Sequence, residues 1–309
     1  MRLGVLDIGS NTVHMLLVDA HYGAAPIPAS KRKMQLRLSE HIGTDGVIDD
    51  VLVTKLISFI RESQKVAEDM GCTSLISFAT SAIRDAANGE AVIARVATET
   101  GLELAVLSGA DEARLTFLAV RRWFGWSSGR LLVMDIGGGS LELASGADEE
   151  PDVAVSLPLG AGRMTRTYIH HDPPTAHEVR ELRKHARAAI ADVVGQLRRV
   201  GDPRVAAASS KTFKQLARIA GAPPTSDGPF IPRHLKRSDV AELVQLLSAK
   251  SVNERVKLPG VSEGRAQQLL AGAIVADAAM DLLEVDELAI CPWALREGVI
   301  LHHMDGLPA

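Results

Sequence analysis

The sequence predicts an α/β protein of two similarly built domains, on the strength of three observations. Two short apolar strands, residues 3–6 and 132–134, each end in an aspartate, enter a turn of Gly with Ser, Thr or Asn, and resume as a second apolar strand. Strand-like and helix-like apolar patterns alternate along the rest of the chain, as in α/β domains. The 309 residues are too many for one ordinary core and suit two domains of typical size.

Apolar spacing and turn residues define the elements of the first domain. Val53, Leu56, Ile57 and Ile60 have helical spacing, and a later helix ends at Gly101 because glycine is a usual C-terminal stop. The predicted order is strands at 3–6 and 13–18, a helix around 53–60, a strand at 75–79, a helix at about 90–101, a strand at 104–107 and a helix that reaches residue 123.

The second domain opens with the second hairpin and continues the same alternation. The predicted order is strands at 132–134, 141–144 and 153–157, a helix at about 176–198, a strand at 204–208, a helix after 212, helices near 238–249 and 263–283, a strand at 288–291 and a last helix through 295–300. Residues 271–283 are rich in Ala and Gly, which predicts tight packing in a core. The Pro- and Gly-bearing segment 221–232 predicts an exposed loop.

The two glycine turns have the composition of phosphate-binding loops. Glycine lets the backbone approach a ligand closely, and the successive N–H groups of such a turn form a concavity that binds anions. The aspartate before each turn offers a carboxylate to a divalent cation. An ordinary strand end would explain either copy alone, but the repetition favours function. The expected phosphate-binding residues are Gly9, Ser10, Asn11, Gly137, Gly138, Gly139 and Ser140, beside Asp7 and Asp135.

Charge and composition exclude several classes of function. With a net charge of -4 and a pI near 6.2, the chain lacks the broad basic field of a general nucleic-acid or membrane-surface binder. Cys72 and Cys291 lie far apart without metal-ligand spacing, so neither a disulfide framework nor a zinc site is expected. No apolar run suits a signal peptide or a membrane span, so we expect a cytoplasmic protein.

Further motifs, in a fixed order, establish a family resemblance. They are Ile83-Arg84, Ser108 to Arg114, Gly160 to Arg163 and Leu295 to Gly298. With the two turns they resemble the exopolyphosphatase and guanosine pentaphosphate phosphohydrolase family, most closely its short actinobacterial form, over essentially the whole chain. The resemblance implies two ribonuclease-H-like domains of the actin, sugar kinase and heat-shock chaperone superfamily, with an interdomain cleft. It implies a first domain at 1–124, completed by a C-terminal helix at 293–309, and a second domain at 125–292.

The resemblance also implies catalytic and metal-binding residues. Glu112, in the first turn of its helix, resembles the family's catalytic base, and Arg84 resembles an arginine used against the reacting phosphate. The family implies Mg²⁺ or another divalent cation held by Asp7, Asp135 and Glu142, with Glu142 also in catalysis and a monovalent cation as an additional candidate. Each assignment has an alternative: Glu112 stabilises its helix, Arg84 pairs with the neighbouring aspartate, and Glu142 faces solvent.

Further phosphate contacts are expected from cations and from a loop of the second domain. These residues are Lys33, Arg37, Arg163, Ser210, Lys211 and Thr212. Relatives carry Ala-Ser-Gly-Thr or a close variant at positions 209–212, but here Lys211 stands at the glycine position. A side chain at this position argues against binding of an adenosine-type ligand and adds a cation where a polyanion would run. In the alternative, Lys211 points to solvent, as a lone lysine at a helix start often does.

Together these residues predict an exopolyphosphatase that releases orthophosphate from the end of inorganic polyphosphate by magnesium-assisted attack of water. The closest alternative is hydrolysis of guanosine pentaphosphate by the same residues. From another class, a kinase-like protein or a nucleotide-binding regulator is a rival, although 209–212 makes a poor adenosine loop and a pure sensor would not need both Glu112 and Arg84. Expected partners are polyphosphate, guanosine pentaphosphate and a second copy in a homodimer, with no nucleic acid and no membrane.

Overall fold

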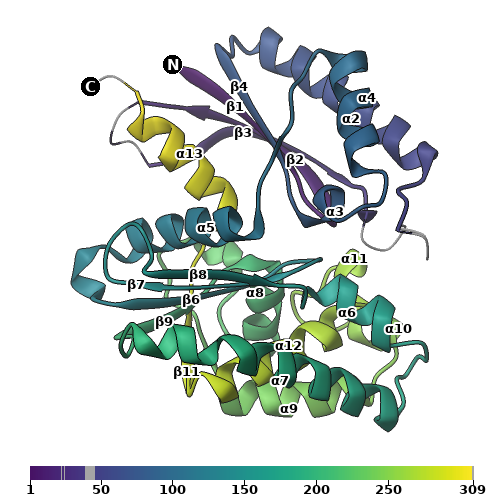
Figure 1. Cartoon of the computed structure of the whole chain (residues 1–309), viewed down its shortest axis with the longest axis vertical. Coiled ribbons are helices and arrows are strands. Elements are labelled where there is room, and N and C mark those ends of the chain that lie inside the picture. Colours follow the sequence, from purple (N-terminus) through teal and green to yellow (C-terminus); the bar gives the residue numbers. More distant parts are fainter. Residues whose placement is uncertain (22, 24, 39–45, 308–309) are drawn as a thin grey trace. The chain divides into compact units, whose positions relative to one another are not determined.

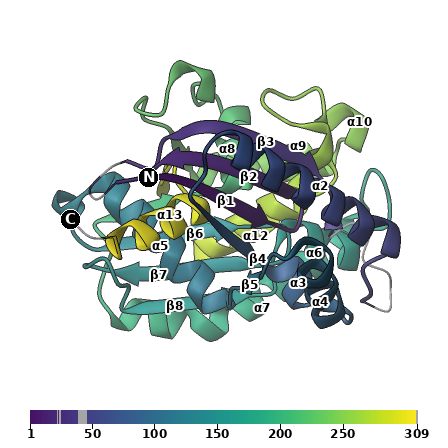
Figure 2. The ribbon, with the colours of Figure 1, turned by 90° about the horizontal axis from the view of Figure 1, so that it is seen from above.

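A computed structural model describes residues 1–21, 23, 25–38 and 46–307 of the chain. The chain forms two compact units, Met1–Ser108 with Arg296–Ala309, and Gly109–Leu295. Figures 1 and 2 show that each unit contains one β-sheet covered by helices. The C-terminal helix thus belongs to the N-terminal unit.

The first unit is built on a five-stranded sheet of mixed direction. Its strands are β1 (Arg2–Ile8), β2 (Thr12–Asp19), β3 (Pro28–Gln35), β4 (Ser74–Ala79) and β5 (Ala105–Val106), in the order β3-β2-β1-β4-β5. Strands β1, β2 and β3 are antiparallel, whereas β4 lies parallel to β1 and β5 parallel to β4. The sequence did not predict β3, because the charged residues Lys31 to Lys33 replace most of its apolar alternation. Such residues suit an edge strand, since they discourage pairing with another chain.

Helices cover both faces of this sheet. In Figure 1, α2 (Asp50–Asp69) and α4 (Gly89–Thr100) lie on one side of the purple strands and α13 (Leu295–Asp305) lies on the other, while α3 (Ser81–Arg84) is a single turn after β4. Asp49 caps α2 by accepting a hydrogen bond from Val51 N–H at 2.6 Å. Gly101 ends α4 with φ at 68°, the left-handed conformation that its glycine predicted. Residues 308–309 of the expected last helix lie outside the described residues.

The second unit repeats this topology on a six-stranded sheet. Its strands are β6 (Leu131–Ile136), β7 (Leu141–Gly146), β8 (Val153–Leu157), β9 (Val205–Ala208), β10 (His234–Lys236) and β11 (Glu287–Ile290), in the order β10-β11-β9-β6-β7-β8. Strands β6, β7 and β8 are antiparallel, and β9 and β11 continue the sheet in parallel. The hairpin β6–β7 therefore takes the place that β1–β2 holds in the first unit.

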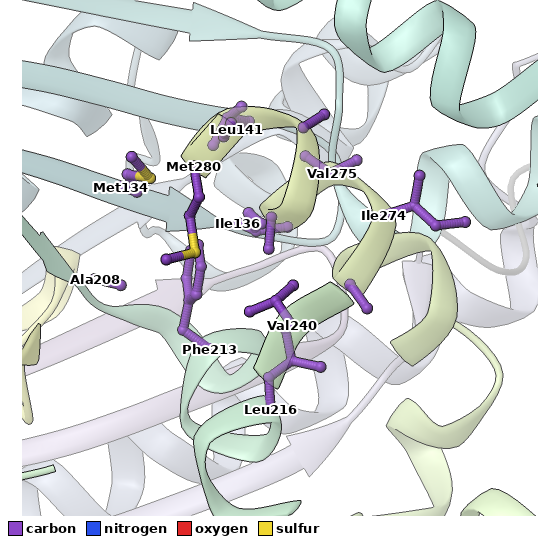
Figure 3. Close-up of a cluster of buried hydrophobic side chains, with 14 of the residues drawn as sticks. Met134, Ile136, Leu141, Ala208, Phe213, Leu216, Val240, Ile274, Val275 and Met280 are labelled. Carbon is purple, nitrogen blue, oxygen red and sulfur yellow. The ribbon is translucent and has the colours of Figure 1, made fainter. Parts of the chain in front are cut away.

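The helices of the second unit enclose a large apolar core on one face of its sheet. Figure 3 shows side chains of β6, α8, α9 and α12 in this core, among them Ile136, Phe213 and Met280. The Ala- and Gly-rich α12 is buried along most of its length, as its composition predicted. The helices are α5 (Gly109–Phe124), α6 (Ala161–Tyr168), α7 (Ala176–Arg199), α8 (Ser210–Ile219), α9 (Arg237–Ser248), α10 (Val252–Arg255), α11 (Glu263–Ala266) and α12 (Leu269–Leu282), with short 3-10 turns η1 (Trp126–Ser128) and η2 (Thr225–Asp227).

Several boundaries differ from those expected. The first domain was expected to reach residue 124, but α5 belongs to the second unit because its buried residues Ala113 and Phe117 pack with Val133 and Ala144 on the second sheet. The helix expected at 263–283 is divided into α11 and α12, and the short helices α6 and α10 were not predicted. Among the described residues, no helix is both long and apolar enough to cross a membrane.

Candidate active site

The two glycine turns have the same hydrogen-bonded form. Gly9 N–H donates to Thr12 O at 3.2 Å, and Gly137 N–H donates to Ser140 O at 2.9 Å. Strand register places Asp7 opposite His14 in the first unit and Asp135 opposite Glu142 in the second. The repeat is therefore structural as well as sequential, but only in the second copy does the paired strand place a carboxylate opposite the aspartate.

Three carboxylates of the second unit, from α5, β6 and β7, influence one another. Glu112 and Glu142 are each 6% exposed, and Asp135 is half-buried. Burial raises the pKa of Glu142 well above its ordinary value, and the negative charges of Glu112 and Asp135 raise it further. Burial also raises the pKa of Asp135. Glu142 thus lies among acidic side chains, in contrast to the alternative in which it faces solvent.

Hydroxyl groups and cations offset part of this negative charge. Ser156 Oγ donates to Glu142 Oε1 at 2.9 Å, and Ser209 Oγ donates to Asp135 Oδ2. The charges of Lys214 and Arg265 lower the pKa of Asp135 against the effect of burial. These groups were not predicted as site residues, because their contacts join segments far apart in sequence. Ser209 was visible only as part of the turn that follows β9.

Within the part of the chain that the structure describes, no three His, Cys, Asp or Glu side chains are arranged to hold a metal ion by themselves. Asp135 and Glu142 nevertheless suit Mg²⁺, because they are hard oxygen donors, and burial of Glu142 and partial burial of Asp135 make their ionised forms costly without a cation. Magnesium is commonly held by one or two carboxylates together with substrate phosphates and waters, and not by a complete protein cage. The donor set therefore fits the expected ion.

The first unit has its own polar cluster at the first turn. Asp7 Oδ2 lies 3.2 Å from Arg296 Nε, which α13 supplies. Burial raises the pKa of Asp7 to about 6; Arg296 opposes this rise and Glu297 adds to it. In the same turn, Ser10 Oγ and Ser81 Oγ lie 3.0 Å apart. The motif around Arg296 was visible in the sequence, but its contact with Asp7 was not.

The cationic residues expected to bind phosphate in the first unit differ in their surroundings. Arg84 Nε donates to Asp85 Oδ1 at 3.2 Å, and its Nη1 donates to Leu107 O at 2.6 Å. The ion pair that was the alternative for Arg84 is therefore present. Arg37 N–H donates to Asn11 O at 3.0 Å, so its backbone adjoins the turn, whereas Lys33 is exposed on β3.

The first turn of α8, where the sequence predicted a loop, combines structural and exposed residues. Thr212 Oγ1 donates to Ile136 O at 2.9 Å, which joins this helical turn to β6. Ser210 has φ at 68°, a left-handed conformation that glycine adopts more readily than serine. Lys211 is exposed, and Arg163 Nε donates to Gly139 O at 2.9 Å. Phosphate binding by these residues stays a prediction.

The chain is similar to known proteins along nearly its whole length. A model of the Ppx/GppA phosphatase family matches residues 17–306. The chain is 52% identical to Exopolyphosphatase 1 of Mycobacterium tuberculosis over 305 residues, which cover 99% of this chain and 89% of the relative. Exopolyphosphatase 1 of Mycobacterium leprae is 50% identical over 305 residues, which cover 99% of this chain and 90% of the relative.

Solved structures give the same fold. The crystal structure of an exopolyphosphatase from Cytophaga hutchinsonii has a TM-score of 0.88 at 24% identity and covers 100% of this chain and 99% of its own. The PPX-GPPA enzyme of Aquifex aeolicus has a TM-score of 0.81 at 26% identity, with 98% and 99% covered. With its two sheets, its repeated glycine turns and a family match along nearly its whole length, the chain belongs to the Ppx/GppA phosphatase family.

Proposed function

We propose that this protein is an exopolyphosphatase, which releases orthophosphate from the end of inorganic polyphosphate by direct attack of water. The observation that carries the proposal is the group of Glu112, Asp135 and Glu142 beside the turn Gly137–Ser140. Hydrolysis of a phosphoanhydride needs fixed donors for phosphate oxygens, a cation that offsets their charge, and a group that orients water. This group supplies a candidate for each need.

Glu112 is proposed to orient the attacking water and to accept its proton. Its carboxylate is buried in the first turn of α5, where the helix dipole favours the ionised form that a base requires. Glu112 has a neighbouring carboxyl group, that of Glu142, close enough for their charges to interact. Such interacting carboxyl groups are common at catalytic sites. The alternative, in which Glu112 only stabilises its helix, predicts no effect of its removal on turnover.

Asp135 and Glu142 are proposed to hold Mg²⁺, which would offset the negative charge of the phosphate oxygens when bound. The hydroxyls of Ser156 and Ser209 hold the two carboxylates in place. The backbone N–H groups of the turn would donate to phosphate oxygens. The first unit offers its own candidate phosphate ligands, which are the turn Gly9–Asn11 and Arg84. Their participation in catalysis is also proposed here.

Polyphosphate is favoured over guanosine pentaphosphate by Lys211. A side chain at this position hinders a nucleoside from coming close to the backbone. It also adds a positive charge that would attract a polyanion. The relatives named Exopolyphosphatase 1 point in the same direction. A homodimer, to be tested by light scattering, is proposed on the family resemblance alone.

The test measures orthophosphate released from medium-length polyphosphate, guanosine pentaphosphate and ATP in parallel, with Mg²⁺ and with EDTA. We expect the fastest release from polyphosphate, and only with the metal. Glu142→Gln should abolish most of it, whereas Glu150→Gln, an exposed glutamate of the same unit, serves as the matched control. Faster release from guanosine pentaphosphate would replace the proposed substrate, and release that survives in Glu142→Gln would contradict the site.

A further inference from the structure

The first turn of α6 is attached to the glycine turn between β6 and β7 by three hydrogen bonds. Ala161 N–H donates to Gly137 O and Arg163 N–H donates to Gly138 O, both at 2.9 Å. The side chain of Arg163 completes the set, because its Nε donates to Gly139 O at 2.9 Å. Three successive carbonyls of the turn therefore point toward α6.

Gly160 permits this contact. A Cβ atom at this position would lie 2.3 Å from both Gly139 C and Ser140 N, closer than real Cβ atoms approach backbone. The atoms that would meet it belong to the main chain and cannot rotate away as a flexible side chain would. Position 160 therefore requires glycine because of packing against the turn.

The peptide groups of the glycine turn also carry N–H donors that have no acceptor. Gly138, Gly139 and Ser140 are buried, and their backbone N–H groups donate no hydrogen bond to any residue within the described ranges. Buried backbone N–H groups nearly always have a partner, so these are suited to an anionic ligand. In a trans peptide the C=O and the following N–H point in opposite directions. Holding Gly138 O and Gly139 O toward α6 consequently directs the N–H groups of Gly139 and Ser140 away from it.

We infer that Arg163 is a positioning residue for the phosphate-binding turn, and that it acts through Gly139 O and not as a cation in contact with phosphate. The inference rests on the proposed function only for the identity of the ligand. It replaces the expectation that the charge of Arg163 binds phosphate. Its physical basis is that donors contribute most to stabilising a developing charge when they are fixed before the ligand arrives.

Two substitutions of equal length separate hydrogen bonding from charge. In Arg163→Gln, the amide nitrogen occupies the place of Nε and still donates, but the positive charge is lost. In Arg163→Met, a methyl group occupies that place and cannot donate. We expect kcat/KM for polyphosphate to fall about 10- to 100-fold in Arg163→Met and to stay near the wild-type value in Arg163→Gln. Arg180→Met, which changes an exposed arginine of α7, is the control.

Hydrogen exchange of the peptide that spans residues 137–141, measured without substrate, gives a readout independent of activity. Exchange should accelerate in Arg163→Met and not in Arg163→Gln. Gly160→Ala perturbs the same contact from the backbone and keeps the inference testable if Arg163→Met does not fold; Gly195→Ala, where a Cβ meets nothing within 4 Å, is its control.

The outcomes are distinct. Equal losses of kcat/KM in the Gln and Met variants, with unchanged exchange, would assign the charge of Arg163 to phosphate and overturn the inference. Wild-type constants in Arg163→Met would overturn it as well. If the wild-type protein releases no orthophosphate from polyphosphate, the proposed function fails, while the exchange measurements still decide whether Arg163 orders the turn.

Discussion

Replacing Asp7 with asparagine should stabilise the metal-free protein at neutral pH. The carboxyl of Asp7 is buried, which raises its pKa from 3.8 to about 6 despite the guanidinium of Arg296 at 3.2 Å. A higher pKa in the folded chain than in the unfolded chain means that folding favours the protonated form. The folded state is therefore penalised progressively as pH rises from about 4 to about 6. An asparagine, which resembles the protonated carboxyl, carries no such penalty.

The size of the effect follows from the shift. At 1.36 kcal/mol for each pKa unit, the rise of Asp7 from 3.8 to about 6 corresponds to about 3 kcal/mol. The free energy of unfolding of Asp7→Asn, relative to wild type, should therefore increase by most of this amount between pH 4 and pH 7.5, because only a small part of the penalty is present at pH 4. The family resemblance also assigns Asp7 to the metal site, and a cation bound by its carboxylate would stabilise only the wild-type protein, so added Mg²⁺ should reduce the difference at neutral pH.

Urea titrations at pH 4, 6 and 7.5 in EDTA provide the measurement. Asp19→Asn is the control in the same unit, because the hydrogen bond and charge of Arg2 lower the pKa of Asp19 and give its substitution the opposite sign. A difference between Asp7→Asn and wild type that is equal at all three pH values would refute the reasoning. It would mean that Asp7 is solvated well enough to ionise normally.

Three other substitutions test the metal site, the contact of Lys211 with substrate and the cap of α7. Asp135→Asn should raise the Mg²⁺ concentration needed for half-maximal activity, whereas Asp192→Asn, exposed on α7, should not; overlapping titration curves would remove Asp135 from the metal site. Lys211→Gly should raise the KM for polyphosphate about fivefold, the equivalent of about 1 kcal/mol, with little change in kcat, and equal constants at low and moderate salt would show that Lys211 does not touch substrate. Thr175→Ala removes the cap of α7 and should lower the free energy of unfolding by about 1 kcal/mol; a smaller loss by urea titration would count against the cap.

The repeated hairpin was predictable because its signals are local. An aspartate at the end of an apolar strand, followed by glycine, marks both the strand end and the turn, and the two copies support each other. The Ala- and Gly-rich α12 was likewise recognisable from composition. Strand β3 was not recognisable, because its charged residues 31–33 interrupt the apolar alternation of a strand. Hydrogen bonds to β2 hold it in the sheet. Short helices such as α6 leave too few turns for a period to be visible.

The acidic residues of the candidate site could be named from the sequence. The residues that form hydrogen bonds and ion pairs with them could not. Asp135 and Glu142 lie opposite each other through strand register, whereas the sequence placed both in one metal site only through the family resemblance. The hydrogen bond from Ser156 requires β8 beside β7, and the approach of Arg296 to Asp7 requires the last helix to return to the first sheet. Such long-range contacts leave no periodic signal in the chain. They follow only from the packed fold.

The most direct test of the central claim is the turnover number of Glu112→Gln on polyphosphate at saturating Mg²⁺, with Asp111→Asn, a neighbour in the same helical turn, as the control. The account predicts a kcat about 10² to 10⁴ times lower in Glu112→Gln, because the variant lacks the base that accepts the proton of water. It predicts a kcat close to wild type in Asp111→Asn and similar stability for all three proteins. An unchanged kcat in Glu112→Gln would show that Glu112 only stabilises its helix and would contradict the proposed mechanism.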